Sequence, residues 1–282
     1  MGRFKSGLLC GIVLIENLCL GYFFSVTEVW SKTMELNLFD NALNSISHGL
    51  EHYSRGIEDD TNYKFAILHI AQGTELLLKE RLSREHPVLI FEKVEKPQGK
   101  TIDFDCSVAR LQNICHISLD KRIRELRTMQ YVRNEIEHYK FIITKNEAET
   151  LIGSIVPFLL EFLENELDTK LQDAVSDDVW QELLLISEVY NKAKKDADEQ
   201  IEALKYEERE GDYHPVWTCA QCREEYMVED KDVEGEAICL LCGHVSQLVD
   251  CRKCGSHFPE DDEDAEHGLC STCADYIKQP YT

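Results

Sequence analysis

The chain has 282 residues, of which 43% are hydrophobic and 29% are charged, so it is long enough for about two domains with packed cores. Its formal net charge is −23 at pH 7, and residues 173–282 carry 28 acidic but 10 basic side chains. A field of that sign opposes loose binding to phosphates, which excludes the C-terminal part as a general nucleic-acid clamp. Any contact with RNA or DNA therefore needs a local basic surface elsewhere.

Residues 1–33 form an apolar leader. A short basic start precedes the mostly apolar segment Gly7–Val26, which resembles a signal peptide or a membrane anchor. Glu16 and Asn17 interrupt this segment near its middle, where a charge is costly in lipid, and no small-residue cleavage site stands out. Two interpretations stay open: an N-terminal anchor whose apolar segment contacts a membrane, or a start-site artefact, with translation beginning at Met34.

Residues 34–172 are predicted to form an antiparallel bundle of four amphipathic helices, because apolar residues recur there at helical spacing. In chain order, the expected helices are Leu36–Gly56, a second helix capped by Thr61 that runs toward His86 and Pro87, Lys121–Ile142 capped by Asp120, and a fourth that begins at Thr144 or Asn146 and runs to about Leu171. Residues 88–118 contain Pro97 and Gly99 and are predicted to form a looser insertion. Pro157 is expected to kink the fourth helix.

Residues 173–214 are predicted to form a helical linker. The segment Asp177–Glu210 is apolar at first and then strongly charged, which indicates a helix whose second half, Lys192–Glu210, is a solvated stalk. Gly211–Pro215 is the expected hinge before the C-terminal segment.

Residues 215–282 contain four Cys-x-x-Cys pairs: Cys219/Cys222, Cys239/Cys242, Cys251/Cys254 and Cys270/Cys273. Sixteen residues separate the first two pairs and fifteen separate the last two, which is the spacing of two tandem four-cysteine zinc ribbons, each a small β-type module. We expect two structural zinc ions, because neither site has an obvious open position. Two arrangements stay open. The first pair can share one ion with the second and the third pair another ion with the fourth, or the pairs that share an ion can interleave along the chain.

The surroundings of the cysteines suggest a compartment and a surface for partners. Zinc thiolates need a reducing environment, so the sequence favours the cytoplasm. His244, His257 and His267 lie near the cysteines but are expected to be bystanders, since eight thiolates complete both sites. The acidic run Glu260–Glu266 is predicted to be a solvated loop, and the acidic tail is a candidate surface for a protein partner.

The predicted third helix carries Arg133, Asn134 and His138. An Arg followed directly by Asn, with a His five residues after the Arg, resembles the signature of the HEPN superfamily, whose all-helical domains are often found in toxins and antiviral RNases. The resemblance covers about residues 36–171. It also includes two other segments: Gln72–Lys79 on the second helix, and the acidic start of the fourth helix at Glu147 and Glu149.

Arg-to-His spacing alone is not specific. Five pairs in the chain meet it: Arg81/His86, Arg110/His116, Arg133/His138, Arg209/His214 and Arg252/His257. Of these five pairs, Arg133/His138 is the one in which Asn directly follows the Arg and which lies on the predicted third helix. In HEPN toxins paired with a minimal nucleotidyltransferase antitoxin, a modified Tyr lies two residues after the His. Here Tyr139 follows the His directly and Lys140 holds the second place, so that form of regulation is not expected.

The resemblance implies a metal-independent endoribonuclease that leaves a 2′,3′-cyclic phosphate and acts on RNA as a homodimer in toxin or antiviral defence. His138 would be the general acid and base, Arg133 would bind the scissile phosphate, and Asn134 would orient His138 or the substrate. On an ideal helix Arg133 and His138 point about 140° apart, so two copies would have to build one groove. The alternative is a non-catalytic HEPN-like module that binds nucleotide or protein.

Overall fold

The computed structural model describes residues 35–139, 141–210, 214–262, 265 and 267–278. Contacts divide the chain into Met1–Glu35 and Leu36–Thr282, and the second unit is described below. The leader at residues 1–33 and most of the expected hinge lie outside the described residues. Within the described residues, no helix is long and apolar enough to cross a membrane. The boundaries expected at residues 172 and 214 stay a prediction.

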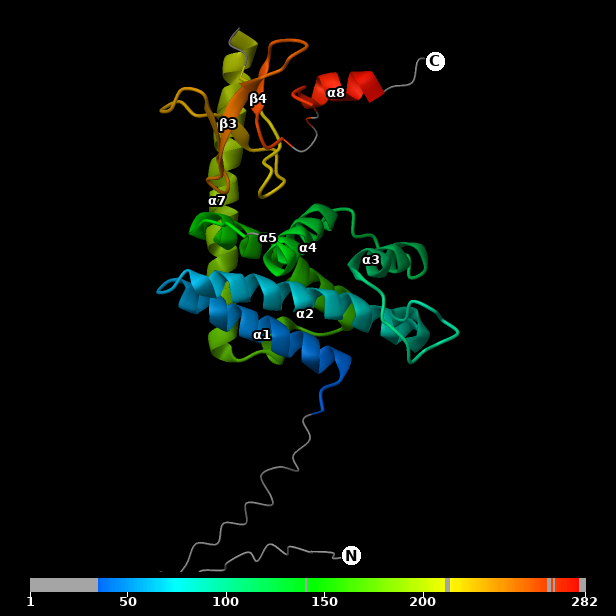
Figure 1. The fold of residues 1–282 in the computed structure, drawn as a ribbon. Coiled ribbons are helices and arrows are strands. Elements are labelled where there is room, and N and C mark those ends of the chain that lie inside the picture. The colour runs from blue at the N-terminus through cyan, green and yellow to red at the C-terminus, as the bar shows by residue number, and fades with distance from the viewer. Residues whose placement is uncertain (1–34, 140, 211–213, 263–264, 266, 279–282) are drawn as a thin grey trace, which may run out of the picture. The chain divides into compact units, whose positions relative to one another are not determined.

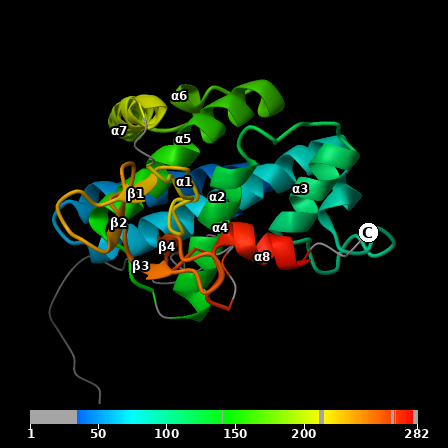
Figure 2. The same cartoon turned by 90° about the horizontal axis from the view of Figure 1, so that it is seen from above.

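The second unit is mainly helical and carries a small antiparallel sheet near its C-terminal end, as the sequence predicts in outline (Figure 1). Its helices are α1 Leu38–Gly56, α2 Thr61–Glu85, the 3₁₀ turn Pro87–Ile90, α3 Phe104–Asn113, α4 Ile123–His138, α5 Lys145–Leu167, α6 Leu171–Ala174, α7 Asp177–Glu210 and α8 Ser271–Lys278. One apolar core joins α1 to α6 with the first turns of α7. Figure 2 shows α1 and α2 side by side.

The close approach of α1 and α2 depends on two glycines. A Cβ atom added to Gly49 would lie 2.5 Å from Ile70 Cγ1, and one added to Gly73 would lie 2.6 Å from Ile46 Cγ1 and 2.9 Å from the backbone oxygen of Ala42. Side chains of ordinary size at either position would push the helices apart, so these glycines set the separation of the pair.

Several helix boundaries differ from those expected because local polar groups make different bonds. Asp120 does not cap α4, which begins three residues later; its carboxylate instead accepts from Ser118 Oγ at 2.9 Å. Thr61 is the first residue of α2 rather than its cap, and its hydroxyl donates to Asp59 Oδ1 at 2.7 Å. The third helix ends at His138 instead of Ile142, because Tyr139 adopts an extended backbone.

The start of α5 is set by Thr144, and Asn146 lies inside the helix. The Thr144 hydroxyl accepts from Glu147 N at 3.3 Å, and Glu147 Oε2 accepts from Thr144 N at 2.6 Å, which is a complete capping box. The helix continues through Pro157 and ends at Leu167, four residues earlier than expected, because Asp168 takes a left-handed backbone with φ of 51°.

The region expected to be a loose insertion contains helix α3. Asp103 caps it by accepting from Cys106 N at 2.9 Å, and Phe104, Val108 and Leu111 are buried at helical spacing. Pro97 and Gly99 precede this helix, so they do not interrupt it. The helix was missed because its apolar stripe is short.

The expectation of a fully solvated stalk is also wrong, since one side of the second half of α7 is buried. Ala197, Ile201 and Leu204 belong to a second core together with strand residues such as Met227 and Ala237. The spacing of four and three residues places the three α7 side chains on one face, and the charged residues of the segment cover the other faces.

The C-terminal segment forms one sheet rather than two separate ribbons. Its strands are β1 Met227–Glu229, β2 Glu236–Cys239, β3 Val245–Asp250 and β4 His257–Pro259, in the spatial order β1-β2-β3-β4. All pairs are antiparallel. The first half of β3 pairs with β2 and its second half pairs with β4, so both cysteine modules share this strand.

Replacing Gly73 by Ala tests the close approach of α1 and α2. Ala favours a helix by about 1 kcal/mol over Gly, but overpacking against the α1 backbone costs about 1–3 kcal/mol. Because one atom in the way is the backbone oxygen of Ala42, which cannot turn aside, we expect the upper part of that cost and a net loss of about 1–2 kcal/mol in the free energy of unfolding, measured by urea denaturation with circular dichroism. The control Gln72→Ala changes an exposed neighbour and should alter the stability by less than about 0.5 kcal/mol. Equal stability of Gly73→Ala and the wild type would contradict the packing argument.

Candidate functional site

Three of the four Cys-x-x-Cys pairs form the same backbone turn. In each, the N–H of the residue directly after the second cysteine donates to the carbonyl of the first cysteine: Arg223 N to Cys219 O at 2.8 Å, Gly243 N to Cys239 O at 2.9 Å, and Gly255 N to Cys251 O at 2.8 Å. The residue that donates has a left-handed backbone, with φ of 63°, 75° and 76° in that order. Glycine suits two of these positions, and Arg223 takes the same conformation without it.

The fourth pair lies on a helix instead of a turn. Cys270 directly precedes α8 and Cys273 lies in its first turn, where Ala274 N donates to Cys270 O at 2.9 Å. The second module therefore combines a turn with a helix end, which the expectation of two β-type ribbons did not include. Both arrangements present two sulfurs to one side, as chelation requires.

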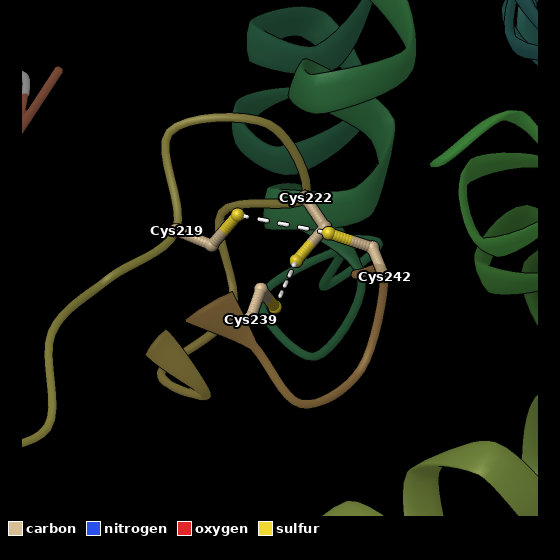
Figure 3. Close-up of side chains that lie close together, drawn as sticks. All are labelled: Cys219, Cys222, Cys239 and Cys242. Atoms are coloured by element: carbon tan, nitrogen blue, oxygen red, sulfur yellow. Dashed lines mark hydrogen bonds between the residues drawn. The ribbon is translucent and has the colours of Figure 1, made fainter. Parts of the chain in front are cut away.

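The eight sulfurs gather in two groups of four, pairing the first motif with the second and the third with the fourth. Within each group the sulfurs all lie within 4.8 Å of one another. Figure 3 shows the first group, where Cys219 Sγ is 3.7 Å from Cys242 Sγ and Cys222 Sγ is 3.7 Å from Cys239 Sγ. The local pairing thus holds, and the interleaved alternative is excluded by this arrangement.

Electrostatics explain why such a cluster fits a cation. Hydrogen bonds from Cys219 and Cys222 lower the pKa of Cys239, whereas the same contacts raise the pKa of Cys242. In the second group, backbone N–H groups of Cys254 and Cys270 lower the pKa of Cys251 to about 6. Four thiolates at this separation repel one another, so a bound cation is needed for all of them to ionise. Four sulfurs around one point fit tetrahedral Zn²⁺.

His244 lies outside both sulfur groups, as expected, but it joins the first cysteine module to the helical bundle. Its Nδ1 lies 2.7 Å from Glu147 Oε1, and its Nε2 lies 2.6 Å from Asp261 Oδ2. The hydrogen bonds that His244 makes to Asp261 and Glu147 raise its pKa to about 10, so the ring is an imidazolium that donates from both nitrogens. Burial alone would raise the pKa of Glu147, but the bonds from His244 and Thr144 outweigh it and lower that pKa.

Asp261 also shows that the acidic run is not uniformly solvated. Its second oxygen accepts from Ser246 Oγ at 2.5 Å, on strand β3. The carboxylate therefore holds the loop after β4 against both β3 and His244. Sequence reasoning missed this role because the partners of His244 are 97 and 17 positions away along the chain.

Helix α4 provides further contacts to the first cysteine module. Arg124 Nη1 lies 3.2 Å from Glu224 Oε2, and the guanidinium of Arg223 lies 4.8 Å from the ring centroid of Tyr131. A third contact comes from α5, where Thr150 Oγ1 donates to Leu241 O at 3.5 Å. The module is thus fixed to α4 and α5 through polar contacts as well as to α7 through the second core.

The three residues of the HEPN-like motif lie at the C-terminal end of α4. His138 is the last residue of the helix, with 75% of its side chain exposed. Arg133 Nη2 lies 3.0 Å from Glu137 Oε2, and His138 Nε2 lies 3.8 Å from the same oxygen. Arg133 also donates to Asn134 Oδ1 at 2.9 Å. Although their Cβ atoms diverge on an ideal helix, the ends of Arg133 and His138 meet at one carboxylate oxygen.

Two of the other Arg/His pairs use their arginine structurally. Arg110 Nη1 donates to Leu89 O at 2.6 Å and to Phe91 O at 2.9 Å, which holds the segment before α3. Arg81 Nε lies 3.2 Å from Glu166 Oε2, an ion pair between α2 and α5. These arginines are committed to backbone or bundle contacts, in contrast to Arg133 on an exposed helix end.

Zinc content tests the two cysteine groups separately. After dialysis against metal-free buffer, native mass spectrometry of the wild type should find two zinc ions, and Cys242→Ser and Cys254→Ser should each lose one ion, because each removes a ligand from a different group. Cys106→Ser, at a cysteine outside both groups, should keep two. Loss of both ions from either single variant, or no bound metal in the wild type, would contradict two independent sites.

Replacing His244 by Ala tests the bridge between module and bundle. It leaves the Glu147 carboxylate, with 6% of its side chain exposed, without its cation, and breaking a buried pair of this kind costs about 3 kcal/mol. We expect that loss in urea unfolding at pH 7. The matched control is His257→Ala, whose pair with Asp250 is 61% and 74% exposed and contributes about 0–1 kcal/mol. Equal losses in the two variants would contradict the special role of His244.

No family model, curated protein or solved structure matches this chain. The resemblance to HEPN domains therefore rests on the residues of the chain itself. What the geometry establishes is a mainly helical protein with two four-cysteine groups that fit metal ions, and with an exposed Arg-Asn-His arrangement at the end of α4.

Proposed function

We propose that this chain is a metal-independent endoribonuclease of the HEPN type, in which the helical bundle carries the chemistry and two zinc ions stabilise the C-terminal modules. The observation that carries the proposal is the meeting of Arg133 Nη2 and His138 Nε2 at one Glu137 oxygen. The carboxylate oxygen thus pairs with the guanidinium and lies near the imidazole. A phosphodiester is also a monoanion, and its free oxygens can accept from the same guanidinium.

Two arginines of α4 are placed to meet an RNA substrate. The acidic C-terminal residues make local cations necessary, and α4 offers Arg127 and Arg133, in a helix whose three arginines are balanced by three glutamates. Arg127 is exposed, and no carboxylate within the described part of the chain forms an ion pair with it. These guanidiniums can neutralise RNA phosphates on either side of the scissile bond.

The proposed reaction uses the 2′-hydroxyl of the RNA as the nucleophile. A base removes its proton, the oxygen attacks the adjacent phosphorus, and the bond from phosphorus to the 5′-oxygen breaks as an acid gives that oxygen a proton. The products are a 2′,3′-cyclic phosphate and a 5′-hydroxyl. His138 serves in proton transfer because an imidazole nitrogen can accept a proton and an imidazolium can donate one, and Arg133 stabilises the charge on the phosphorane. Asn134 orients the arginine to which it is bonded.

One base and one acid are needed at the same time, so two copies of His138 in a homodimer complete the site. Exposure of His138 and Tyr139 at the end of α4 leaves this surface accessible to a second copy. The zinc ions stand outside the reaction in this proposal, since their four thiolates complete a tetrahedron. A role in toxin or antiviral defence would follow from the family resemblance.

RNA cleavage in a buffer without divalent cations tests the proposal. We expect the wild type to release 2′,3′-cyclic phosphate ends, detected by mass spectrometry of the fragments. His138→Ala should slow cleavage by about 10²–10⁴-fold, and Arg133→Ala by about 10²-fold or more. The matched control His116→Asn removes an exposed imidazole from another Arg/His pair, at φ of 56° that Asn tolerates, and should keep full activity.

Equal cleavage by the wild type, His138→Ala and Arg133→Ala would defeat the catalytic assignment. If no variant cleaves RNA but the wild type binds nucleotide or protein through the α4 surface, the non-catalytic interaction module is the better reading. The i,i+4 pair of Arg133 and Glu137 favours that second candidate, because such pairs are common on exposed helices.

Glu137→Gln distinguishes a phosphate site from an ordinary surface pair. In a His138→Ala background, which prevents cleavage, the change removes the negative charge that competes with RNA for Arg133. An exposed pair contributes up to about 1 kcal/mol, so RNA affinity should rise by about two- to fivefold. Fluorescence anisotropy with a labelled RNA measures this affinity. The control is Glu135→Gln, which removes the same charge from the same helix but not from the ion pair with Arg133. Unchanged affinity in Glu137→Gln would count against Arg133 as a phosphate ligand.

A further inference from the structure

Three histidines from α1 and α2 lie together on the surface of the bundle, apart from the cysteine groups and from α4. His48 and His52 are one helical turn apart on α1, so they share a face, and His69 lies opposite them on α2. The ring centroid of His69 is 6.2 Å from that of His48 and 5.6 Å from that of His52. Neither the RNase proposal nor the zinc modules use these side chains.

The three rings lie somewhat farther apart than imidazoles that share a metal ion. With metal–nitrogen bonds of about 2.0 Å and tetrahedral angles, two ring centroids on one ion lie roughly 5 Å apart. The two measured separations are longer than this, and the ring nitrogens are not gathered as closely as the sulfurs of the cysteine groups. The rings of His52 and His69 are stacked at 8°, so binding requires the His69 ring to turn while His52 keeps its contact with Asn62. His48 has room to move, since 52% of its side chain is exposed.

The backbone beneath the three rings is held at a fixed separation. Gly49 lies between His48 and His52 in the sequence, and a Cβ atom there would lie 2.5 Å from Ile70 Cγ1 and 3.1 Å from Ala66 O. The glycine contact therefore brings α2 against α1 at the position of the histidines. A rigid pair of helices places ligands more accurately than loops do.

Two of the rings have oxygen acceptors at Nδ1, which is the arrangement that supports metal-binding histidines. His52 Nδ1 lies 3.0 Å from Asn62 Oδ1, and Asn62 Nδ2 donates to Asp59 O at 3.1 Å. Because the amide nitrogen is committed to that carbonyl, the amide oxygen faces His52 and accepts its Nδ1 proton. His48 Nδ1 lies 3.5 Å from Glu51 Oε2. A ring that donates from Nδ1 to such a partner presents Nε2, on its other side, to a metal ion.

We propose that His48, His52 and His69 form a binding site for a divalent transition-metal ion of the Zn²⁺ class. The Nε2 atoms of His48 and His52 and a ring nitrogen of His69 are the ligands, and Asn62 and Glu51 are positioning residues. Three neutral imidazoles suit Zn²⁺ and its neighbours Ni²⁺ and Cu²⁺. The fourth position stays open to water, and the three ligands are exposed or partly exposed side chains, so we expect this ion to exchange with the solvent and to be lost on dialysis.

The test uses the full, tag-free chain after dialysis, with the cysteine groups loaded, and Zn²⁺ alone as the probe. On titration, native mass spectrometry and calorimetry should show one further ion in the wild type. His48→Gln, His52→Gln and His69→Gln should each abolish its stoichiometric uptake. Asn62→Ala should weaken uptake by about 10–100-fold, as loss of a partner behind a ligating His does. The control His116→Asn, with an exposed imidazole elsewhere, should bind the further ion like the wild type.

A measurement on the unmodified chain keeps the proposal testable if a variant folds poorly. The ring ¹⁵N resonances of His48, His52 and His69 should shift together and saturate at one added equivalent. No further ion in the wild type, or no shift of these rings, would overturn the proposal. Uptake that persists when all three histidines are replaced would also overturn it and would assign the ion to the acidic C-terminal residues.

Discussion

The buried carboxylate of Glu147 connects the helical bundle with the cysteine modules. Only 6% of this side chain is exposed, and a buried charge without partners would cost several kcal/mol. One oxygen accepts from Thr144 N and completes the start of α5, and the other contacts the His244 imidazolium. His244 follows Cys242 by two residues and contacts Asp261 beyond β4. Glu147, His244 and Asp261 therefore link the start of α5, the first cysteine group and the loop after β4.

Through this linkage, ions bound at the cysteine groups would help to place α4. The first module also contacts Arg124 and Tyr131, which are seven residues apart, and His138 follows after another seven. Residues at that interval share one face of a helix. The cysteine module thus packs along the face of α4 that ends in the candidate RNA site. Zinc would act on the proposed chemistry through structure, by fixing this helix, while the proton transfer stays with His138.

Features that depend on local sequence could be predicted, and features that depend on distant partners could not. The long helices α1, α2, α5 and α7 follow from apolar residues at helical spacing, and the local pairing of the cysteine motifs was one of the two arrangements that the spacing allowed. In contrast, α3 has one short apolar stripe. Ala197, Ile201 and Leu204 are outnumbered by charged neighbours, so their burial against the sheet was hidden in the sequence. The same holds for His244, whose role depends on residues far along the chain.

Hydrogen–deuterium exchange before and after chelation of zinc tests the central claim most directly, namely that the metal groups and the bundle are one coupled structure. The account predicts faster exchange after zinc removal in residues 215–250, and also in the first turn of α5 and along α4, while the centre of the α1–α2 pair, around Gly49 and Gly73, keeps its protection. Restoring zinc should restore the protection. Exchange that accelerates in the cysteine modules alone, with α4 and α5 unchanged, would contradict the account.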